Sequence, residues 1–352
     1  MKHNITIVWW TDGFWKWLAG YILQHFSNQV EVTLTGRNIK KGEDIAQLFW
    51  CHFTNDNISA VKNADITIFA TPIGFTYQCI KEISPHIKKW SVVADVTSIK
   101  ESPKKAFHKY CDPSILILPT HPMFGPFVSN ISEQIFVLTP EEDVKNDTRY
   151  QFFKKHLEKW WASVIETSAQ HHDTMMAIVQ WLTHYNMFSV ARCLQTLWID
   201  IAESMQFMSP IYKIMVSSVW RYIDQNPWLY ADIQMNNPII QDVHESFMNA
   251  SKEFHTIVKE KDTSTFAQLI TESKQHFWNE AQKWQHYTDK IIYLLSKQSE
   301  KVQNNIGNHI SLIHIYTGKK ISGKVKKFEK GYIHITNESH SYHIDEWEII
   351  TE

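Results

Sequence analysis

Glycine is scarce in this sequence of 352 residues. Ordinary usage of about 7% predicts about 25 glycines in this length, whereas the chain has 10. Tryptophan, which is normally rare, occurs 15 times. Many of the tryptophans stand where a tight turn or a close backbone approach favours glycine. The two anomalies together suggest that tryptophan has replaced glycine at a set of positions.

Paired cysteines, long apolar runs and a dominant charge are also missing. The four cysteines are scattered and form no C-x-x-C pair, which is typical of a reduced cytosolic protein. No apolar run reaches membrane-spanning length and no signal-peptide pattern opens the chain, so we expect a cytoplasmic protein. A net charge of −2 gives no sign of a nucleic-acid surface. The 19 histidines include no HExxH motif, and we expect no metal site.

Short apolar runs alternate with helical segments through the first half of the chain. Strands are expected at residues 5–8, 30–35, 51–54, 65–70, 91–96, 115–118, 134–138 and 163–166. Helices are expected near residues 16–23, 41–49, 77–87 and 102–110. This alternation predicts an α/β fold in which residues 1–168 form a parallel, doubly wound Rossmann-type sheet.

Beyond this sheet the pattern changes twice. Long helices are expected at residues 173–197, 209–225, 237–262 and 264–299, so residues 169–299 form an all-α domain. The first of these helices is apolar on nearly every side, which predicts burial by its own domain and by a second subunit, and hence a homodimer. Residues 300–352, with short strands separated by turns, predict a small, barrel-like β module. This module is either a packing appendage or a regulatory or interaction module.

His121 follows the expected strand 115–118 in the sequence His-Pro-Met-Phe-Gly-Pro. Open α/β sheets bind their ligands at the carboxyl ends of their strands. Pro122 and Pro126 restrict the backbone on both sides of the turn and so hold the imidazole in place. A neutral imidazole in a cleft can accept a proton near physiological pH, which makes His121 a candidate general base. The alternative is a hydrogen-bonded histidine in a tight turn.

The turn after the first expected strand is where dinucleotide-binding proteins carry the GxGxxG fingerprint. The candidate cofactor-binding residues in this turn are Trp10, Thr11, Asp12, Gly13 and Phe14. Read literally, the fingerprint is broken, because an indole fills the space that the pyrophosphate needs. At the end of the second strand stands Arg37, with no carboxylate beside it. An arginine there suits a 2′-phosphate and favours NADP over NAD, unless it is a solvated surface residue.

Several motifs in the right order resemble the prephenate dehydrogenase family. They are residues 95–100 (DVTSIK), 121–126 (HPMFGP), His172-Asp173 with Gln180 and His184, and residues 209–213 (SPIYK) with Arg221 and residues 225–232 (QNPWLYAD). The similarity covers residues 4–295 and leaves the β module outside. The family oxidises and decarboxylates prephenate to 4-hydroxyphenylpyruvate on the route to tyrosine, with hydride transfer to NAD(P). The resemblance implies this activity for the chain, with arogenate or another hydroxyacid as the alternative substrate.

The resemblance also implies a role for each matched residue. His121 matches the catalytic histidine, which draws the proton from the ring hydroxyl, and Ser98 matches the serine that contacts this histidine and the cofactor. His184 and Arg221 match substrate-site positions, and the planar guanidinium of Arg221 suits a substrate carboxylate. Lys213 lies about two helical turns before Arg221 and adds positive charge to the same helix.

Two further residues, Thr71 and Pro72, end the fourth strand, where the family lines the nicotinamide side of the cofactor. Because the substrate is a dianion and aromatisation drives the loss of CO₂, a base and converging cations suffice. Neither a metal nor a covalent nucleophile is needed.

Twelve tryptophans stand where the family has glycine or where a turn favours it. They are Trp9, Trp10, Trp15, Trp50, Trp90, Trp160, Trp161, Trp181, Trp198, Trp220, Trp278 and Trp284. Trp17, Trp228 and Trp347 look genuine. Our hypothesis is a systematic replacement of glycine by tryptophan, for example through a UGA codon that the host reads as glycine but that is translated here as tryptophan. If the tryptophans are real, the alternative is a cofactor-free relative that acts as a binding or regulatory protein.

Overall fold

The computed structural model describes residues 2–8, 14–126, 128, 130–315, 317–329, 331–336 and 340–350. Four of the expected cofactor-binding residues, Trp10, Thr11, Asp12 and Gly13, lie outside these ranges. The chain divides into two compact units, Met1–Ser251 and Lys252–Glu352. The division into domains 1–168, 169–299 and 300–352 stays a prediction.

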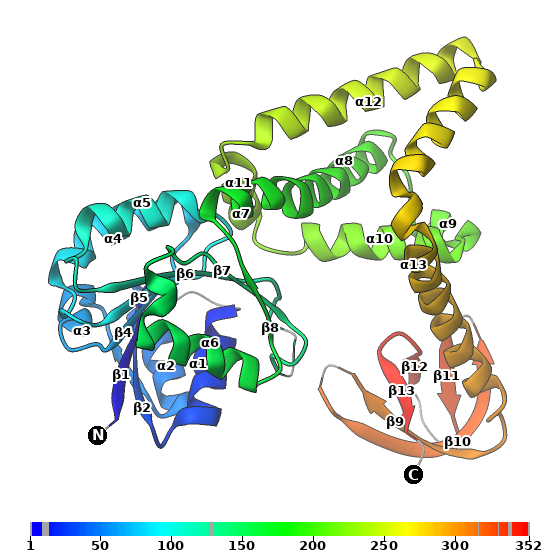
Figure 1. Ribbon diagram of the computed structural model, residues 1–352. Helices are drawn as coiled ribbons and strands as arrows, with labels where there is room; N and C mark the ends of the chain where they lie inside the picture. The colour runs from blue at the N-terminus through cyan, green and yellow to red at the C-terminus, as the bar shows by residue number, and fades with distance from the viewer. Residues whose placement is uncertain are drawn as a thin grey trace. The chain divides into compact units, whose positions relative to one another are not determined.

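An eight-stranded sheet organises the first unit (Figure 1). Its strands are β1 (His3–Val8), β2 (Val30–Thr35), β3 (His52–Thr54), β4 (Ile66–Phe69), β5 (Val92–Asp95), β6 (Leu116–Pro122), β7 (Ile135–Leu138) and β8 (Ser163–Glu166). Their order is β3-β2-β1-β4-β5-β6-β7-β8, and β1 to β6 are mutually parallel. All eight expected strands are present, so the Rossmann-type fold is confirmed.

The expectation of an entirely parallel sheet is wrong at one place, because β7 runs antiparallel to β6. Parallel neighbours need a long crossover, usually a helix. In its described residues, the connection between β6 and β7 contains no helix. Pairing with β7 also extends β6 through His121, which faces Val137. The histidine therefore lies within the last residues of its strand and not just beyond it.

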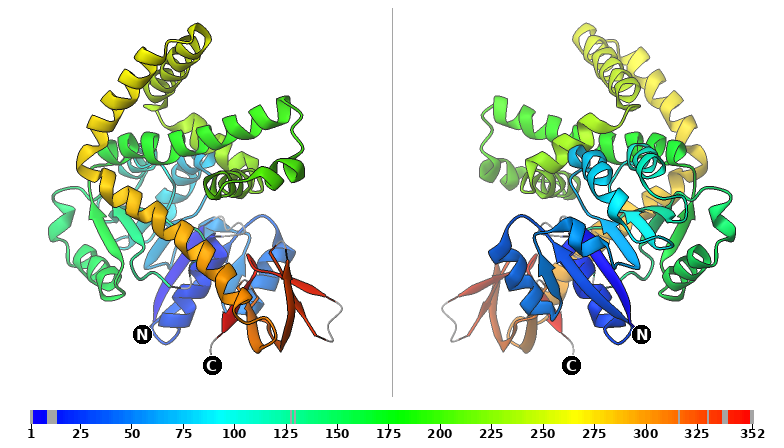
Figure 2. Two further views of the ribbon diagram at one scale, coloured as in Figure 1. Left: turned by 90° about the vertical axis from the view of Figure 1, so that its right-hand side faces the viewer. Right: turned by 90° about the vertical axis from the view of Figure 1, so that its left-hand side faces the viewer.

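Helices cover both faces of the sheet (Figures 1 and 2). They are α1 (Phe14–Phe26), α2 (Ile39–Phe49), α3 (Asn57–Val61), α4 (Ile73–Ile83), η1 (Ser84–His86), α5 (Glu101–Tyr110), η2 (Val144–Asn146) and α6 (Thr148–Lys159). Successive residues of a strand point to opposite faces. Ile7 accordingly packs with Ala19 of α1, whereas Val8 packs with Ile80 of α4 and Phe107 of α5. Each face thus has its own buried core.

The remaining helices of the first unit follow β8. They are α7 (Ala169–Met176), the π-helix η3 (Ala177–Leu182), α8 (Thr183–Thr196), α9 (Ile201–Ser204), η4 (Met205–Phe207), α10 (Pro210–Ile223) and α11 (Pro227–Asn236). Helix α12 (Ile240–Glu260) crosses into the second unit. Ser209 caps α10 by accepting a hydrogen bond from the Tyr212 backbone N–H, as expected.

The expected helix 173–197 is interrupted by the π-helix η3. The apolar pattern suggested a helix buried on every side. Within the single chain, however, part of its surface stays exposed. Ile178 and Val179 are 46% and 50% exposed in the single chain. An apolar face left open in this way is available to a second subunit.

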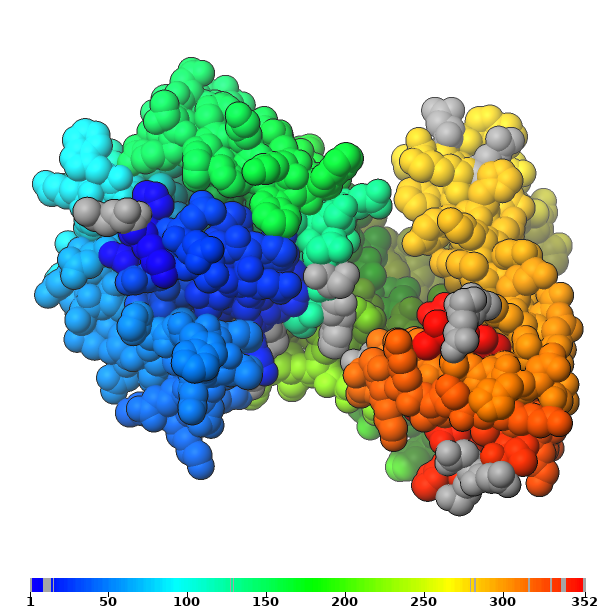
Figure 3. All heavy atoms as spheres, turned by 90° about the horizontal axis from the view of Figure 1, so that it is seen from below, coloured from blue at the N-terminus to red at the C-terminus, as the bar shows by residue number. Residues whose placement is uncertain are grey.

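The second unit contains the long helix α13 (Thr263–Gln303) and a five-stranded antiparallel sheet. The strands are β9 (His309–His314), β10 (Lys320–Glu329), β11 (Tyr332–Ile335), β12 (Ser341–His343) and β13 (Trp347–Ile350), in the order β12-β11-β10-β9-β13. They form one compact body, orange to red in Figure 3. Val302 at the end of α13 is fully buried in its core. The small β module is therefore confirmed.

Candidate functional site

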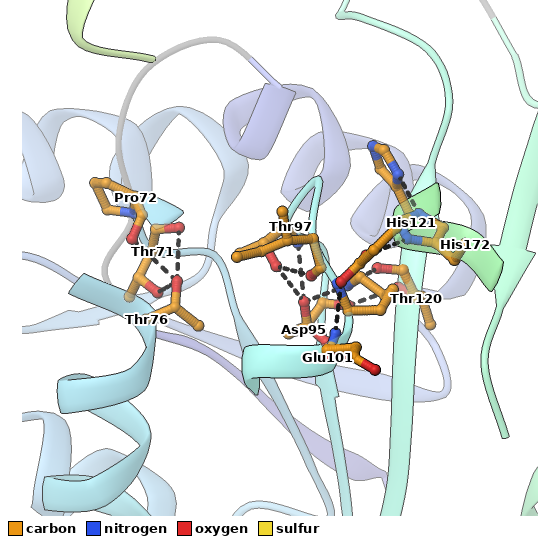
Figure 4. Close-up of polar contacts among 12 residues, drawn as sticks. Thr71, Pro72, Thr76, Asp95, Thr97, Glu101, Thr120, His121 and His172 are labelled. Carbon is orange, nitrogen blue, oxygen red and sulfur yellow. Dashed lines mark hydrogen bonds and ion pairs between the residues drawn. The ribbon is translucent and has the colours of Figure 1, made fainter. Parts of the chain in front are cut away.

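Three neighbouring strands end at one edge of the sheet and carry the matched motifs there. Thr71 and Pro72 follow β4, Asp95 ends β5, and Thr120 and His121 lie near the end of β6. Figure 4 shows these residues in a row along the edge. Because β4, β5 and β6 are parallel neighbours, their carboxyl ends meet, which is where open α/β sheets bind ligands.

The imidazole of His121 is buried and held on both nitrogens. Its Nδ1 lies 2.9 Å from Nε2 of His172 on α7. Its Nε2 lies 3.4 Å from Nε2 of Gln180 on the π-helix. The expected base at the end of β6 is thus in contact with the helices that follow the sheet.

Burial lowers the pKa of His121 well below its usual value, because the low-dielectric surroundings disfavour the imidazolium. Repulsion between the two imidazoles when both carry a proton, and repulsion from Lys100, lower the pKa further. His121 is therefore neutral at physiological pH, the state in which an imidazole accepts a proton.

A fully buried ion pair supports the backbone beneath His121. Lys100 Nζ bonds Asp95 Oδ2 and donates to the carbonyl oxygen of Thr120 at 2.6 Å. The same carboxylate oxygen accepts from the backbone N–H of Thr97 at 3.1 Å and from its hydroxyl at 2.6 Å. The segment 95–100 is therefore fixed to the residue that precedes His121.

One carboxylate connects the sheet to the following helices. Asp173 Oδ1 accepts from the backbone N–H of Lys100 at 2.7 Å, and Oδ2 accepts from that of Glu101 at 3.0 Å. The backbone oxygen of Asp173 accepts from Asn237 Nδ2 at 2.7 Å. Asp173 thereby closes the first turn of α5 and ties α7 to the loop that carries Ser98.

An aromatic cluster surrounds His184 on α8. Its ring centroid lies 4.9 Å from those of Tyr222 and Tyr230. Tyr230 also packs against Ile73 and Ile99, which directly follow Pro72 and Ser98. The predicted substrate residue His184 is therefore joined, through Tyr230, to the carboxyl ends of β4 and β5.

The charges of this cluster differ from what the residue types alone suggest. Burial lowers the pKa of His184 to about 4, so the side chain is neutral at pH 7. Burial raises the pKa of Tyr230 to about 12, and the positive charge of Arg221 opposes that shift. The guanidinium thus lies close enough to act on Tyr230. His184 therefore contributes no positive charge at pH 7, whereas Arg221 does.

Two buried polar atoms in this region have no hydrogen-bond partner among the described residues: Gln180 Oε1 and His184 Nδ1. The two residues are four apart along adjoining helical segments, so they share one face. A buried polar atom without a partner is costly, and native proteins rarely leave one unsatisfied. These atoms are available to a polar ligand.

The other candidate residues are placed as follows. Ser98 is half-buried, and in the part of the chain that the structure describes it makes no hydrogen bond to His121. Thr71 is buried, with its hydroxyl 2.7 Å from that of Thr76. Lys213 lies half-buried on α10, the helix of Arg221.

Two candidates lie on the cofactor side. Arg37 is exposed just past β2. Phe14 begins α1, and its ring centroid lies 5.5 Å from that of Phe124, in the turn after His121. From β1 the chain adds strands toward one edge of the sheet, up to β3, and then from β4 on toward the other edge, so the order of the strands reverses between β1 and β4. Dinucleotides bind at such a reversal, so the topology and the arginine after β2 fit a nicotinamide dinucleotide.

Sequence reasoning named His172 and Asp173 only as a motif at the start of a helix, and it did not foresee their contact with His121. It also missed the Lys100–Asp95 pair and the central position of Tyr230. One signal was available: a lysine and an aspartate stand within the apolar segment 92–100, where an unpaired charge is costly.

In the described ranges, no group of three His, Cys, Asp or Glu side chains is placed to hold a metal ion. The same ranges contain no helix that is both long and apolar enough to span a membrane.

Comparison with known proteins gives matches along most of the chain. The family models of the prephenate dehydrogenase nucleotide-binding domain and dimerization domain match residues 20–166 and 168–272. The chain is 40% identical over 330 residues to the probable arogenate/prephenate dehydrogenase of Methanocaldococcus jannaschii. This match covers 94% of this chain and 73% of that protein. It is 28% identical over 219 residues to the T-protein of Haemophilus influenzae, covering 62% of this chain and 57% of that protein.

Solved structures share the fold at low sequence identity. Prephenate dehydrogenase from Aquifex aeolicus, in complex with hydroxyphenyl propionate and NAD+, matches with a TM-score of 0.63 at 15% identity, over 79% of this chain and 98% of that one. Synechocystis arogenate dehydrogenase matches with a TM-score of 0.56 at 16% identity, over 80% of this chain and 99% of that one.

Proposed function

Because the chain belongs to the prephenate dehydrogenase family of NAD(P)-dependent enzymes, we propose that it oxidises and decarboxylates prephenate to 4-hydroxyphenylpyruvate. The observation that carries this proposal is the buried, neutral His121 at the carboxyl edge of the sheet. It faces Gln180, which has a polar atom without a partner. The candidate base His121 and a polar group that lacks a hydrogen-bond partner therefore lie side by side at this edge of the sheet.

In this reaction Nε2 of His121 takes the proton of the C4 hydroxyl as the C4–H bond breaks. The nicotinamide, when bound, accepts the hydride released from C4. The C4 oxygen becomes a carbonyl, and cleavage of the carboxylate from C1 then sends an electron pair through the ring to that oxygen. The imidazolium of His121 returns its proton to the resulting phenolate, so the base is regenerated. Such a base contributes about 10²–10⁴ in rate.

The dianionic substrate needs cations, and Arg221 with Lys213 on α10 supplies them. A guanidinium binds a carboxylate through two parallel hydrogen bonds, so we assign a substrate carboxylate to Arg221. His184 is neutral at pH 7 and orients the substrate by hydrogen bonding through its unpartnered Nδ1. Ser98 beside Ile99, and Thr71 and Pro72, face the reacting ring from the cofactor side.

The cofactor is assigned as NADP in preference to NAD on the strength of Arg37, which follows β2 where a 2′-phosphate is recognised. The ratio of kcat/KM for NADP+ to that for NAD+ tests the assignment. We expect Arg37→Ala to lower the ratio at least about tenfold, the effect of losing one charge-assisted contact. An unchanged ratio would contradict it.

We also propose that the protein is a homodimer in the cytoplasm. Large apolar side chains are exposed along the region that matches the dimerization domain: Ile178, Val179, Leu197, Phe207, Ile211 and Leu229. The four cysteines are free, which suits a reducing compartment. Light scattering on the purified chain should give twice the mass of one chain. A monomer at micromolar concentration would contradict the assembly.

Offering prephenate, arogenate and simple hydroxyacids, each with NADP+ and NAD+, tests the activity. We expect reduced nicotinamide to form with prephenate, and arogenate is the alternative that the family leaves open. Turnover of simple hydroxyacids alone would contradict the proposal. No turnover with any substrate, in a chain with glycine at the twelve suspect tryptophan positions, would instead favour a binding or regulatory protein.

A further inference from the structure

His172 and Asp173 form a buried chain of hydrogen bonds behind His121. His172 Nδ1 lies 2.7 Å from Asp173 Oδ1, and its Nε2 lies 2.9 Å from His121 Nδ1. All three side chains are almost completely buried. Figure 4 shows His121 and His172 facing each other across the gap between strand and helix.

The hydrogen bonds of Asp173 decide which imidazole nitrogens carry protons. An ionised carboxylate only accepts, so His172 Nδ1 must donate to Asp173. A neutral His172 then has a bare Nε2, which accepts from Nδ1 of His121. His121 is therefore protonated on Nδ1 and bare on Nε2, the nitrogen that faces Gln180.

We propose that His172 and Asp173 are positioning residues that hold His121 in the one tautomer able to act as a base. The proposal rests on the proposed function, in which Nε2 of His121 takes the substrate proton. When that proton arrives, the Nδ1–H bond to His172 becomes charge-assisted, and the chain ends on the negative charge of Asp173. A carboxylate behind an imidazole fulfils the same role in other enzymes, where its loss puts the proton on the wrong nitrogen.

Charged groups surround the two imidazoles. Lys100 faces both imidazoles and disfavours their protonation, while Asp95 neutralises Lys100. Asp173 favours a proton on His172. The Asp173 carboxylate also accepts hydrogen bonds from the two backbone N–H groups at the start of α5. The same carboxylate therefore holds both His121, through His172, and the loop that carries Ser98.

The experiment compares His172→Leu, His172→Gln and Asp173→Asn with His171→Gln, an exposed neighbour that serves as control. We expect His172→Leu to lower kcat by about 10²–10⁴, the range for removing such a partner, with KM changed less than about threefold. His172→Gln should retain more kcat, because its amide oxygen can accept from His121 Nδ1. The control should match the unmodified chain. Wild-type kcat in His172→Leu would overturn the proposal.

A second readout needs neither turnover nor a folded variant. Nitrogen-15 spectra of the unmodified chain should show His121 protonated on Nδ1 and bare on Nε2. A proton on Nε2 at neutral pH would overturn the proposal. Failure of the proposed function is distinguishable, because it would appear as no turnover of prephenate or arogenate while the tautomer is still measured. If Asp173→Asn unfolds, which thermal unfolding would reveal, the His172 variants and the spectra decide.

Four tryptophans have left-handed backbone conformations: Trp50, Trp90, Trp161 and Trp198, with φ of 56°, 63°, 62° and 55°. Among the described residues other than glycine, Glu133 and Lys261 are the only others with positive φ. The four indoles are 75–94% exposed, so packing does not hold them in this conformation. Left-handed positions favour glycine, because any Cβ meets the backbone there.

Three of the four end a helix in the same way. After each helix the backbone N–H of the tryptophan bonds the carbonyl three residues back, and the next N–H bonds the carbonyl five residues before it. These pairs are Trp50 to Gln47 with Cys51 to Ala46, Trp161 to Glu158 with Ala162 to Leu157, and Trp198 to Gln195 with Ile199 to Leu194. This is the Schellman motif, whose left-handed residue is usually glycine.

Trp181, one of the twelve suspects, is 3% exposed and stacks on Tyr185, so its packing gives no sign of a replaced glycine. Two tryptophans outside the twelve also show what an integrated indole looks like. Trp17 donates from Nε1 to the carbonyl of Val128 at 2.8 Å and stacks on Tyr21. Trp347 is buried in the core of the β module. We infer that the protein made in its own host carries glycine at positions 50, 90, 161 and 198, and tryptophan at 17 and 347.

Peptide mass spectrometry of the protein isolated from its own host tests this inference. We expect glycine masses at positions 50, 90, 161 and 198 and tryptophan masses at 17 and 347, which serve as internal controls. UGA codons at the first four positions and UGG codons at the two controls should accompany this result. Tryptophan masses at the four left-handed positions would overturn the inference.

Discussion

Replacing Lys100 by methionine removes one half of a fully buried ion pair. Lys100 and Asp95 are both 0% exposed, and methionine keeps a similar unbranched shape. The Asp95 carboxylate would keep its hydrogen bonds from Thr97 but lose its cation, and the carbonyl of Thr120 would lose a donor. The perturbation therefore leaves an uncompensated charge directly beneath His121.

Removing one partner of a buried pair costs about 3–5 kcal/mol of unfolding free energy. We expect Lys100→Met to destabilise the protein by that amount. The double variant Asp95→Asn with Lys100→Met removes both charges and should recover a large part of the lost stability. Burial already lowers the pKa of Lys100 against the attraction of Asp95, because a buried charge is costly even when it is paired. Lys105→Met is the matched control: its partner Glu101 is four residues away on the exposed face of α5, and such a pair is worth less than about 1 kcal/mol.

Urea unfolding followed by circular dichroism measures these differences. Because the chain has two compact units, it can unfold in more than one transition. The transition to compare is the one whose urea midpoint differs between the variants. The reasoning would be refuted if Lys100→Met lay within about 1 kcal/mol of Lys105→Met, far below the cost of an unpaired buried charge. A double variant no more stable than Lys100→Met alone would also contradict it.

Three further predictions follow from the same contacts. Burial lowers the pKa of His184 to about 4, below its value in the unfolded chain. As the pH falls, the unfolded state therefore takes up a proton first, and stability decreases between about pH 6.5 and about pH 4. His184→Phe should abolish on the order of 2–3 kcal/mol of that loss, measured by unfolding at pH 7 and near pH 4.5; an unchanged pH dependence would count against it. Each of Trp50→Gly, Trp90→Gly, Trp161→Gly and Trp198→Gly should raise stability by about 1 kcal/mol in thermal unfolding, whereas Trp17→Gly should lower it; no gain at any of the four would contradict the strain argument. Arg221→Gln should raise KM for prephenate by about 10–100-fold with a smaller change in kcat, as expected for a lost charge-assisted hydrogen bond, and equal losses in both would point to another role.

The sheet could be predicted because its strands are short apolar runs between turn residues. Most of those runs are largely buried, so their composition alone marks them, whereas β3 and β8 at the two edges of the sheet are more exposed. Helix α6 was missed because its apolar residues are few: Tyr150 and Leu157 are the buried ones in a strongly charged segment. The reversed direction of β7 was missed because strand direction depends on the connection and not on the strand itself.

The candidate site could be predicted only in part. His121 was marked by its place after an apolar run, and the family motifs pointed to His184 and Arg221. The contact between His121 and His172 joins residues 51 positions apart in different secondary-structure elements. No local pattern reports such a contact, because it depends on how α7 docks on the sheet. The neutral state of His184 likewise arises from burial among Tyr222 and Tyr230, which only the packing reveals.

The most direct test of the account is the steady-state rate at which the purified chain reduces NADP+ or NAD+ with prephenate, compared between the unmodified protein, His121→Asn and His108→Asn. His108 is half exposed on α5 and serves as control. We predict that prephenate is turned over, that His121→Asn loses about 10²-fold or more in kcat, and that His108→Asn keeps the full rate. Undiminished turnover by His121→Asn would contradict the central claim that this buried imidazole is the base.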